Sequence, residues 1–219
     1  MKLIAAGREA DVYLVDDERV LRRNRGGRSA VEEGTRIRAL HAAGYPVPRV
    51  GSVDGPDIVM ERVTGPTLSE ALLSGSATAA DAARLLARLH DDLHAIPWPD
   101  GPLIHLDLHP ENVLLGPGGP VVIDWANARP GPAGLDVAMT LLILAQVVVT
   151  PGMLAAGATL APAIRADVLE VISTLAATVS TPAAPFVDDA VAQRRLDPNL
   201  SAAEDSYLGQ AADLLRELA

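Results

Sequence analysis

The spacing of apolar and polar residues predicts a strand-rich beginning of the chain and a helix-rich remainder. Segments of strand character at residues 12–15 and 19–22 flank the polar triplet 16–18, which predicts a β-hairpin. Residues 49–53 also have strand character, and residues 58–60 form a further short apolar strand. Because a helical segment separates the two pairs, the first sixty residues are expected to have the order β-β-α-β-β.

The helix between the strand pairs is predicted to begin at Ser29, which can cap it together with Glu32 three residues later. Its inner stripe contains Glu33, Ile37 and Leu40, and Gly44 is expected to end it, since glycine commonly terminates helices. This stripe is apolar except for Glu33.

The remainder of the chain has helical periodicity. Thr78 can cap a helix with Asp81 at the capping-box position. The apolar face of that helix consists of Ala82, Leu85, Leu86, Leu89 and Leu93. Further helices are predicted at about 134–149, 153–178 and 201–218. The change from strand to helix character predicts two lobes, residues 1–62 and 63–219.

Composition narrows the classes of protein to consider. The chain has 219 residues and no cysteine, so its core must form without disulfides, which fits a reducing cytoplasm. The first eight residues are too short and too soon charged for a signal peptide, and the longest apolar run, 137–149, predicts a buried helix rather than a membrane span. A formal net charge of -10 disfavours binding to nucleic acids. We therefore expect a cytoplasmic protein without nucleic-acid or membrane partners.

Positive charge gathers in one short segment of the chain. The five arginines of this segment are Arg19, Arg22, Arg23, Arg25 and Arg28. A phosphate-binding strand explains part of this cluster, and an exposed, solvated strand and loop explain it equally well for all but one of the five.

The most informative polar residues surround a second predicted hairpin, whose strands are 113–115 and 121–123. Asp107 and Asn112 precede this hairpin, and Asp124 follows it. A hairpin folds back on itself, so we expect Asn112 and Asp124 to lie side by side. Two oxygen ligands suit a hard cation such as Mg²⁺. The carboxylate of Asp107 can then accept or orient the proton of an attacking hydroxyl group.

These residues resemble the aminoglycoside phosphotransferase/choline kinase family, whose members are distant relatives of protein kinases. His105-Leu106-Asp107 followed by Asn112 is similar to the family's catalytic loop, in which glycine usually precedes the aspartate. Asp124-Trp125 resembles the metal-binding aspartate, and Gly131-Pro-Ala-Gly-Leu-Asp136 resembles a further family motif. The resemblance implies an α+β, two-lobed protein-kinase-like fold. Its N-terminal lobe would hold an antiparallel sheet with one helix, and its C-terminal lobe would be mainly helical with a catalytic β-hairpin.

The resemblance also implies roles for single residues. Asp107 would be the catalytic base, Asn112 and Asp124 would hold Mg²⁺, and ATP or GTP would be the phosphoryl donor. The expected nucleotide-binding positions are Gly7, Arg22, Glu33, Met60, Glu61 and Val63. Arg22 stands where the family usually has lysine. A carboxylate on an apolar stripe is costly to bury unless it is paired, so we expect an ion pair between Glu33 and Arg22, with Arg22 facing Asp124.

Several histidines and acidic residues have plainer interpretations. His105 is expected to brace the catalytic loop, and Asp136 to support it through backbone contacts. His90 and His94 are one turn apart and can bind a metal, but beside two aspartates at a helix end we expect them to be solvated. A zinc or iron hydrolase built on His105, Asp107 and His109 is the competing metal hypothesis, and it lacks a recognisable second ligand motif.

Three functions remain open at this point. The first is transfer of a phosphoryl group to a hydroxyl of a small molecule, which the intact Asp107 favours. The second is a non-catalytic nucleotide-binding or pseudokinase module, suggested by the sparse glycine loop and Arg22. The third is a small RIO-like protein kinase.

The acceptor is not identified by these residues. The helical part after residue 136 is shorter than in typical antibiotic kinases of the family, and it contains few aromatic residues, which argues against a choline-type aromatic cage. The short helical part also allows a homodimer in which a partner chain completes the pocket. The acidic residues of this part are expected to be solvated rather than to meet a cationic substrate; they are Asp188, Asp189, Glu204 and Asp205.

Overall fold

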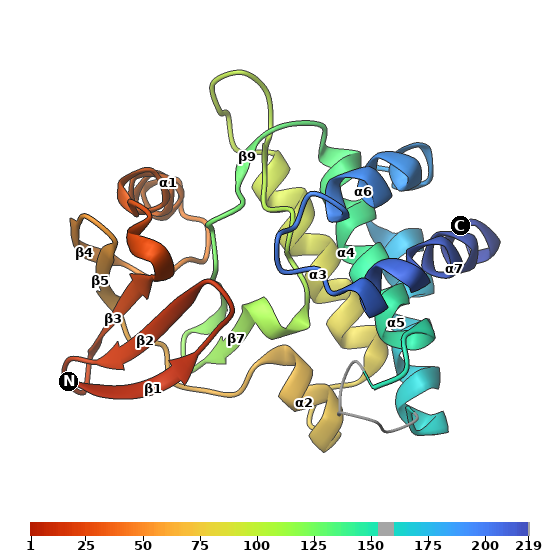
Figure 1. Cartoon of the computed structure of the whole chain (residues 1–219), viewed down its shortest axis with the longest axis horizontal. Coiled ribbons are helices and arrows are strands. Elements are labelled where there is room, and N and C mark those ends of the chain that lie inside the picture. The colour runs from red at the N-terminus through yellow and green to blue at the C-terminus, as the bar shows by residue number, and fades with distance from the viewer. Residues whose placement is uncertain (153–159, 219) are drawn as a thin grey trace. The chain divides into compact units, whose positions relative to one another are not determined.

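The computed structural model describes residues 1–152 and 160–218 (Figure 1). The chain forms two compact units. The first contains Met1–Thr67 and Asn112–Ala128, and the second contains Leu68–Glu111 and Arg129–Ala219. The lobe boundary after residue 62 stays a prediction.

The first unit is built on an antiparallel sheet of five strands in the order β1-β2-β3-β5-β4. The strands are β1 (Lys2–Ala6), β2 (Ala10–Leu14), β3 (Arg19–Asn24), β4 (Val50–Asp54) and β5 (Asp57–Glu61). The helix α1 (Val31–Ala42) lies between β3 and β4 in sequence, after a short 3₁₀ turn η1 (Arg25–Gly27). The predicted order β-β-α-β-β is therefore present with one additional strand. Pattern analysis missed β1 because all five of its residues are exposed, so no buried face produces an alternation.

The two ends of helix α1 are capped in different ways. Its N-cap is Ala30, and the Ser29 hydroxyl only accepts from the Val31 N–H at 3.4 Å, so the predicted capping box with Glu32 is wrong. At the other end, the Gly44 N–H donates to His41 and the Tyr45 N–H to Leu40. This pair of bonds is a Schellman motif, and Gly44 has the positive φ of 84° that the motif requires.

Close packing fixes α1 on the sheet. Gly34 faces β4, and a Cβ atom at this position would lie 2.4 Å from a methyl group of Val53. Only glycine therefore lets the helix approach the strand this closely. The predicted inner stripe is confirmed, since Glu33, Ile37 and Leu40 are all buried.

The second predicted hairpin is present and belongs to the first unit. It consists of β7 (Val113–Gly116) and β8 (Gly119–Val122), paired in the register Val113↔Val122. The Leu115 N–H donates to Pro66 O at 2.8 Å, which fastens the hairpin to the segment after β5. Gly65 lies so close that a Cβ atom there would be 2.1 Å from Leu115 O.

The second unit is mainly helical. Its helices are α2 (Leu68–Ser74), α3 (Ala79–His94), α4 (Ala133–Val149), α5 (Pro162–Thr178), α6 (Val187–Arg194) and α7 (Ala202–Leu218). Two short strands, β6 (Leu103–Ile104) and β9 (Arg129–Pro130), pair with each other. The unit also contains the 3₁₀ turn η3 (Ala184–Phe186). A further 3₁₀ turn, η2 (Pro110–Asn112), begins in this unit and ends in the first. Thr78 caps α3 by accepting from the Asp81 N–H, as predicted. Of the predicted helix 153–178, residues 153–159 lie outside the described residues. Helix α6 was not predicted.

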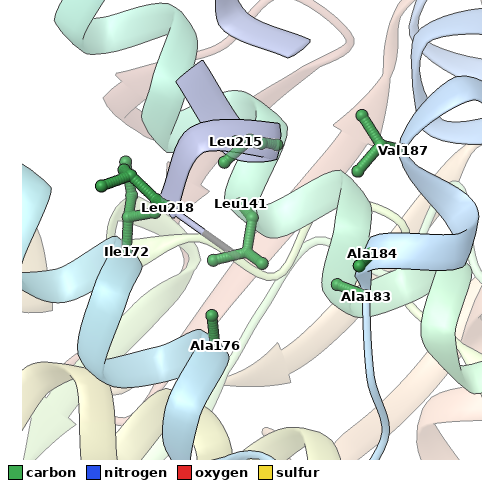
Figure 2. A pocket seen from close by; sticks show the side chains of 8 residues that line it. All are labelled: Leu141, Ile172, Ala176, Ala183, Ala184, Val187, Leu215 and Leu218. Carbon is green, nitrogen blue, oxygen red and sulfur yellow. The ribbon is translucent and has the colours of Figure 1, made fainter. Parts of the chain in front are cut away.

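Helix α4 is the centre of this unit. Every residue from Gly134 to Gln146 is buried, which confirms the predicted buried helix, and α3, α5, α6 and α7 pack around it (Figure 1). Figure 2 shows Leu141 of α4 at an apolar hollow, facing Ile172 of α5 and Leu215 of α7. Among the described residues, no helix is long and apolar enough to cross a membrane.

The expectation of four solvated acidic residues is wrong for one of them. Glu204 is buried at the start of α7. Its carboxylate accepts from the Ser201 N–H at 2.8 Å, and its own N–H donates to the Ser201 hydroxyl at 3.2 Å. This reciprocal pair is a capping box, so the role of Glu204 is to start the helix.

Candidate active site

Arg22 on β3 is the centre of a buried charge cluster in the first unit. Its Nη1 donates to Glu33 Oε2 at 2.8 Å and to Asn24 Oδ1 at 2.6 Å. Its Nη2 donates to Asp124 Oδ1 at 2.8 Å. The predicted ion pair with Glu33 is therefore present, and Arg22 faces Asp124 as expected. A single guanidinium links the carboxylate of α1 to the carboxylate that follows β8.

Glu33 is destabilised in its charged form by its surroundings. Burial raises the pKa of Glu33, the charge of Arg22 opposes this, and the charge of Asp124 adds to it, so the pKa lies above its ordinary value. The Oε1 atom of Glu33 is buried and has no hydrogen-bond partner among the described residues. The cluster thus holds two carboxylates with one cation and has an unsatisfied acceptor.

The other four arginines of the basic segment are surface residues. Each is exposed and forms an ion pair with a nearby carboxylate: Arg19 with Asp16, Arg23 with Asp57, Arg25 with Asp11 and Arg28 with Glu9. Only Arg22 among the five is buried. The solvated interpretation therefore holds for these four, and the buried cation is the one predicted to meet phosphates.

The remaining positions that were predicted to bind the nucleotide lie at or near strand ends of the same unit. Gly7 is in the turn between β1 and β2, where its N–H donates to Ala10 O at 2.8 Å. Met60 and Glu61 end β5, and Val63 follows two residues later. The Glu61 N–H donates to Arg49 O at 2.9 Å, so a contact from the Glu61 backbone to a base would have to come from its carbonyl oxygen.

The hairpin ends bring the predicted metal-binding segments together. Asn112 directly precedes β7, and Asp124 follows β8 by two residues. The Ile123 N–H donates to Asn112 O at 3.0 Å, which holds the two chain ends against each other. The Asp124 side chain is 39% exposed, so its carboxylate is accessible from solvent. A carboxylate and an amide are oxygen donors of the kind that Mg²⁺ prefers, and these two residues fit such an ion.

The loop around Asp107 belongs to the second unit and is held by α4. The Leu106 N–H donates to Asp136 Oδ1 at 2.6 Å, and the Thr140 hydroxyl donates to Leu108 O at 2.9 Å. The Asp107 N–H donates to His105 Nδ1 at 3.2 Å. The structural roles predicted for His105 and Asp136 are therefore confirmed. Leu106 has a φ of 68°, which is a left-handed conformation. Glycine adopts this conformation most easily, and glycine is the usual residue at this position of the family's catalytic loop.

Asp107 and His109 form a coupled pair. Their side chains approach to 3.4 Å between Nε2 and Oδ1. Burial raises the pKa of Asp107, but the hydrogen bond with His109 and the charges of His109, His105 and Arg194 outweigh burial, so the pKa lies below its ordinary value. Burial lowers the pKa of His109, and the bond and charge of Asp107 reverse this, so its pKa lies above its ordinary value. Asp107 is therefore a carboxylate at neutral pH.

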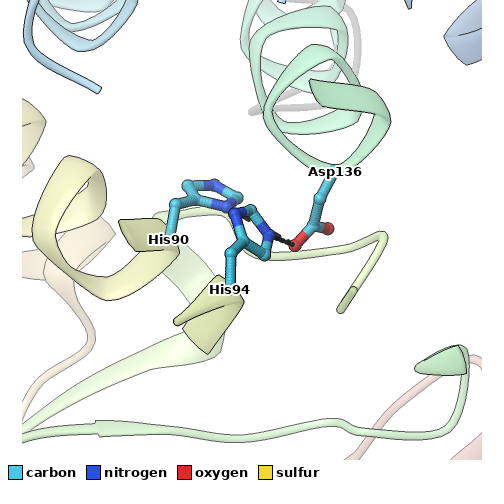
Figure 3. A group of neighbouring side chains, drawn as sticks. All are labelled: His90, His94 and Asp136. Atoms are coloured by element: carbon cyan, nitrogen blue, oxygen red, sulfur yellow. Dashed lines mark hydrogen bonds and ion pairs between the residues drawn. The ribbon is translucent and has the colours of Figure 1, made fainter. Parts of the chain in front are cut away.

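His90, His94 and Asp136 form a buried cluster beneath this loop (Figure 3). His94 Nε2 lies 2.9 Å from Asp136 Oδ2, and His90 Nδ1 lies 3.5 Å from the same oxygen. The expectation that both histidines are solvated is wrong. It rested on the neighbouring aspartates of α3, whereas the partner Asp136 comes from α4.

The hydrogen bonds around His90 show which of its ring nitrogens carries a hydrogen. The Thr140 hydroxyl hydrogen is used in the bond to Leu108, so His90 Nε2, at 3.0 Å from Thr140 Oγ1, must be the donor there. Burial raises the pKa of Asp136, but the close approach and charges of His90 and His94 lower it far below its ordinary value. The three side chains offer ligand atoms within 4.8 Å of one another, a donor set that suits zinc. Asp136 already accepts from Leu106 and His94, and we interpret the cluster as a brace for the loop.

Arg194 is a residue of this region that the sequence did not indicate. It ends α6, is buried, and its charge contributes to lowering the pKa of Asp107. Helix α6 has only eight residues, and its weak periodicity gives no signal for the helix or for this side chain.

The sequence and the fold agree on one family. The model of the phosphotransferase enzyme family matches residues 1–103 and 91–177. The chain belongs to this family. No curated protein matches the sequence. The fold is that of aminoglycoside phosphotransferases, so the predicted α+β protein-kinase-like fold is confirmed.

Three solved structures illustrate this likeness of fold. The first is aminoglycoside phosphotransferase APH(2'')-Ib with ADP bound, at 10% identity and a TM-score of 0.56, covering 98% of this chain and 91% of that one. The second is the gentamicin complex of APH(2'')-IIa, at 11% identity and a TM-score of 0.60, covering 100% and 91%. The third is the streptomycin–ATP ternary complex of APH(2'')-IIa, at 12% identity and a TM-score of 0.57, covering 98% and 92%.

Proposed function

We propose that this phosphotransferase-family protein transfers the γ-phosphoryl group of ATP to a hydroxyl group of a small molecule. The observation that carries the proposal is the buried Arg22, held between Glu33 and Asp124. A buried cation linked to a predicted metal ligand is the arrangement needed to receive a nucleotide phosphate and its counterion. Solved structures of the same fold with ADP or ATP bound support ATP as the donor.

In this proposal the first unit handles the nucleotide. Arg22 binds the phosphates, and Glu33 keeps its guanidinium in place. The side chains of Asn112 and Asp124 would hold Mg²⁺. When bound, that ion neutralises charge on the phosphates during transfer. Because Asp124 already binds Arg22 at 2.8 Å, its carboxylate must share or exchange this partner when the metal arrives.

Asp107 acts on the acceptor. Its carboxylate orients the acceptor hydroxyl and takes its proton as the new oxygen–phosphorus bond forms and the bond to the leaving ADP breaks. The lowered pKa makes Asp107 a weak base, so positioning contributes more than proton affinity. The bond from Leu106 to Asp136 and the bond from Thr140 to Leu108 keep the loop backbone in place for this task.

The competing proposal is a non-catalytic nucleotide-binding module. One observation favours it: Arg22 donates directly to the carboxylate that would have to bind the metal. In such a module Arg22 would replace the metal rather than assist it, and bound ATP would remain unchanged.

The test compares wild type, Asp107→Asn and Asp92→Asn. Asp92 is an exposed aspartate of α3 and serves as the matched control. Thermal shifts with ATP, GTP and Mg²⁺ report binding, and release of ADP with a panel of alcohol acceptors reports transfer. We expect all three proteins to bind Mg·ATP, and only Asp107→Asn to lose transfer, by about 10²–10⁴-fold. Equal turnover by wild type and Asp107→Asn, or binding without any turnover in wild type, would contradict the proposal.

A further inference from the structure

The end of α6 is fastened beside the Asp107 loop by two contacts within the second unit. Gln193 accepts from Arg129 Nη2 at 2.9 Å, and Arg129 pairs with Ile104, the residue that precedes His105. Arg194 Nε donates to Gln146 Oε1 at 3.1 Å, on the same helix α4 that holds the loop. The two contacts come from neighbouring residues of α6. Arg194 is thereby positioned in the acceptor half of the proposed site.

The hydrogen bond between Arg194 and Gln146 leaves a buried donor of Gln146 unused. A guanidinium Nε–H can only donate, so the Gln146 amide must present its oxygen to Arg194 and direct its nitrogen elsewhere. That nitrogen is buried, and it has no hydrogen-bond partner among residues 1–152 and 160–218. Arg194 Nη1 donates to Asp197 Oδ2 at 2.8 Å. An unpaired buried donor is costly, so the amide nitrogen of Gln146 needs an acceptor that the described residues do not supply.

We propose that Arg194 and Gln146 form a carboxylate-binding subsite, and that the phosphoryl acceptor is therefore a hydroxylated carboxylic acid. This inference rests on the proposed function and names its substrate class. A carboxylate offers two oxygens to the fork of a guanidinium and to an amide N–H. Asp197 neutralises part of the charge of Arg194, so the subsite suits a single carboxylate rather than a dense anion. A polycation such as an aminoglycoside would instead meet the buried positive charge of Arg194.

The electrostatics of the loop agree with this placement. The positive charge of Arg194 lowers the pKa of Asp107 and also that of His109, so it is felt at both side chains. A substrate carboxylate bound to Arg194 would bring its hydroxyl groups close to Asp107, which is what transfer requires.

The acceptor test uses pairs of molecules that differ mainly at one group. Glycerate is compared with glycerol, gluconate with glucitol, and serine with serinol. Glycerol 3-phosphate is tested as an acceptor that carries a phosphate group, and gentamicin as an acceptor that is a polycation. Transfer from Mg·ATP is followed by mass spectrometry, and binding by ligand-observed NMR with a non-hydrolysable ATP analogue. We expect the carboxylate member of at least one pair to be favoured about tenfold or more in KM and in binding.

The variants test the subsite directly. Arg194→Gln is expected to raise the KM for the carboxylate acceptor by about 10–100-fold with little change in the KM for ATP. Gln146→Glu keeps the bond to Arg194 Nε and places an anionic oxygen where Nε2 was, so it should fold and yet weaken carboxylate binding at least as much. Arg195→Gln is the control, because Arg195 is exposed and pairs with Asp205.

The outcomes separate the two proposals. If Mg·ATP is bound and phosphoryl transfer occurs, but glycerol, glycerol 3-phosphate or gentamicin is the favoured acceptor, the carboxylate subsite is wrong and the proposed function stands. If no pair shows a preference for the carboxylate in turnover or in binding, the subsite is likewise wrong. If carboxylates bind through Arg194 and no transfer occurs with Mg·ATP present, the subsite stands and the proposed function fails.

Discussion

Asp136 accepts the backbone N–H of Leu106 at 2.6 Å, and this one bond joins the central helix of the second unit to the residue before the proposed base. The donor belongs to a residue in a left-handed conformation, and the acceptor is a fully buried carboxylate. Its other oxygen lies 2.9 Å from His94 Nε2. The position of Asp107 therefore depends on a charged group that never meets the substrate.

Replacing Asp136 by asparagine should separate nucleotide binding from transfer. Asparagine keeps the shape but has one acceptor oxygen for two donors, so either Leu106 or His94 loses its partner. We expect kcat to fall by about 10²-fold and the free energy of unfolding by about 1–3 kcal/mol, with the Kd for Mg·ATP nearly unchanged. Steady-state kinetics and urea unfolding measure these, with Asp92→Asn as the control. If the affinity for Mg·ATP fell by as large a factor as kcat, the role of Asp136 would not be confined to the Asp107 loop.

The same carboxylate predicts a pH dependence of stability. Its pKa is depressed in the folded protein, so it contributes stability that is present above its unfolded pKa of about 3.9 and is lost as pH falls further toward the folded value. Wild type should therefore lose more unfolding free energy between about pH 5 and pH 3 than Asp136→Asn does. Urea titrations of both proteins across this range measure the difference. If the unfolding free energies of both proteins changed in parallel with pH, the pKa of Asp136 would not be lowered in the folded protein.

Leu106→Gly tests whether glycine, the usual residue before the catalytic aspartate in the family, would stabilise this chain. Glycine relieves the left-handed backbone by about 1 kcal/mol, since non-glycine residues are disfavoured there. The Leu106 side chain is buried, however, and removing it costs about 2–3 kcal/mol or more. The loss of burial wins, so we expect net destabilisation of about 1–2 kcal/mol in urea unfolding. A more stable variant would mean that strain dominates at this position.

The sequence was informative where a residue broke its own local pattern. Glu33 interrupts an apolar stripe, and this observation together with the family resemblance predicted the ion pair with Arg22 that the structure shows. The presence of the second hairpin followed from two short apolar segments around a glycine- and proline-rich turn. In both cases the information lies within a few residues of the element itself.

Long-range partners could not be predicted in the same way. His90 and His94 stand beside solvated aspartates, and their burial depends on Asp136 some forty residues later in the chain. Arg194 closes a short helix of weak periodicity, and its partner Gln146 is one polar residue in an otherwise apolar helix. Edge strand β1 has no buried face at all. Each depends on packing that local periodicity does not encode.

His109→Gln should move the acid limit of activity upward. Within the Asp107–His109 pair, the bond and charge of His109 are the largest effects that oppose burial and lower the pKa of Asp107. A carboxylate whose pKa lies below its ordinary value is ionised throughout the range from about pH 5 to pH 8, so wild-type kcat/KM should not fall in this range through protonation of Asp107. Without His109, burial is opposed less and the limb should shift to higher pH. Profiles of kcat/KM for wild type, His109→Gln and the exposed control His41→Gln measure it. An unshifted limb in His109→Gln would contradict the pairing.

Arg22 offers the sharpest test of the nucleotide half of the site, because its neighbour on the strand is a natural control. Arg22→Met removes the cation that donates to both Glu33 and Asp124, and leaves two buried or half-buried carboxylates together. Arg23→Met removes an exposed arginine paired with Asp57. We expect Arg22→Met to weaken binding of Mg·ATP by about 10–100-fold and to lower the free energy of unfolding by about 3–5 kcal/mol, and Arg23→Met to change each by less than about 1 kcal/mol. Arg22→Lys should restore part of both, since lysine keeps the charge but cannot reach Glu33 and Asp124 with separate nitrogens. Calorimetric titration with Mg·ATP and urea unfolding provide the two readouts. Tighter binding of Mg²⁺ alone to Arg22→Met than to wild type would show that Arg22 competes with the metal for Asp124, as the non-catalytic alternative requires.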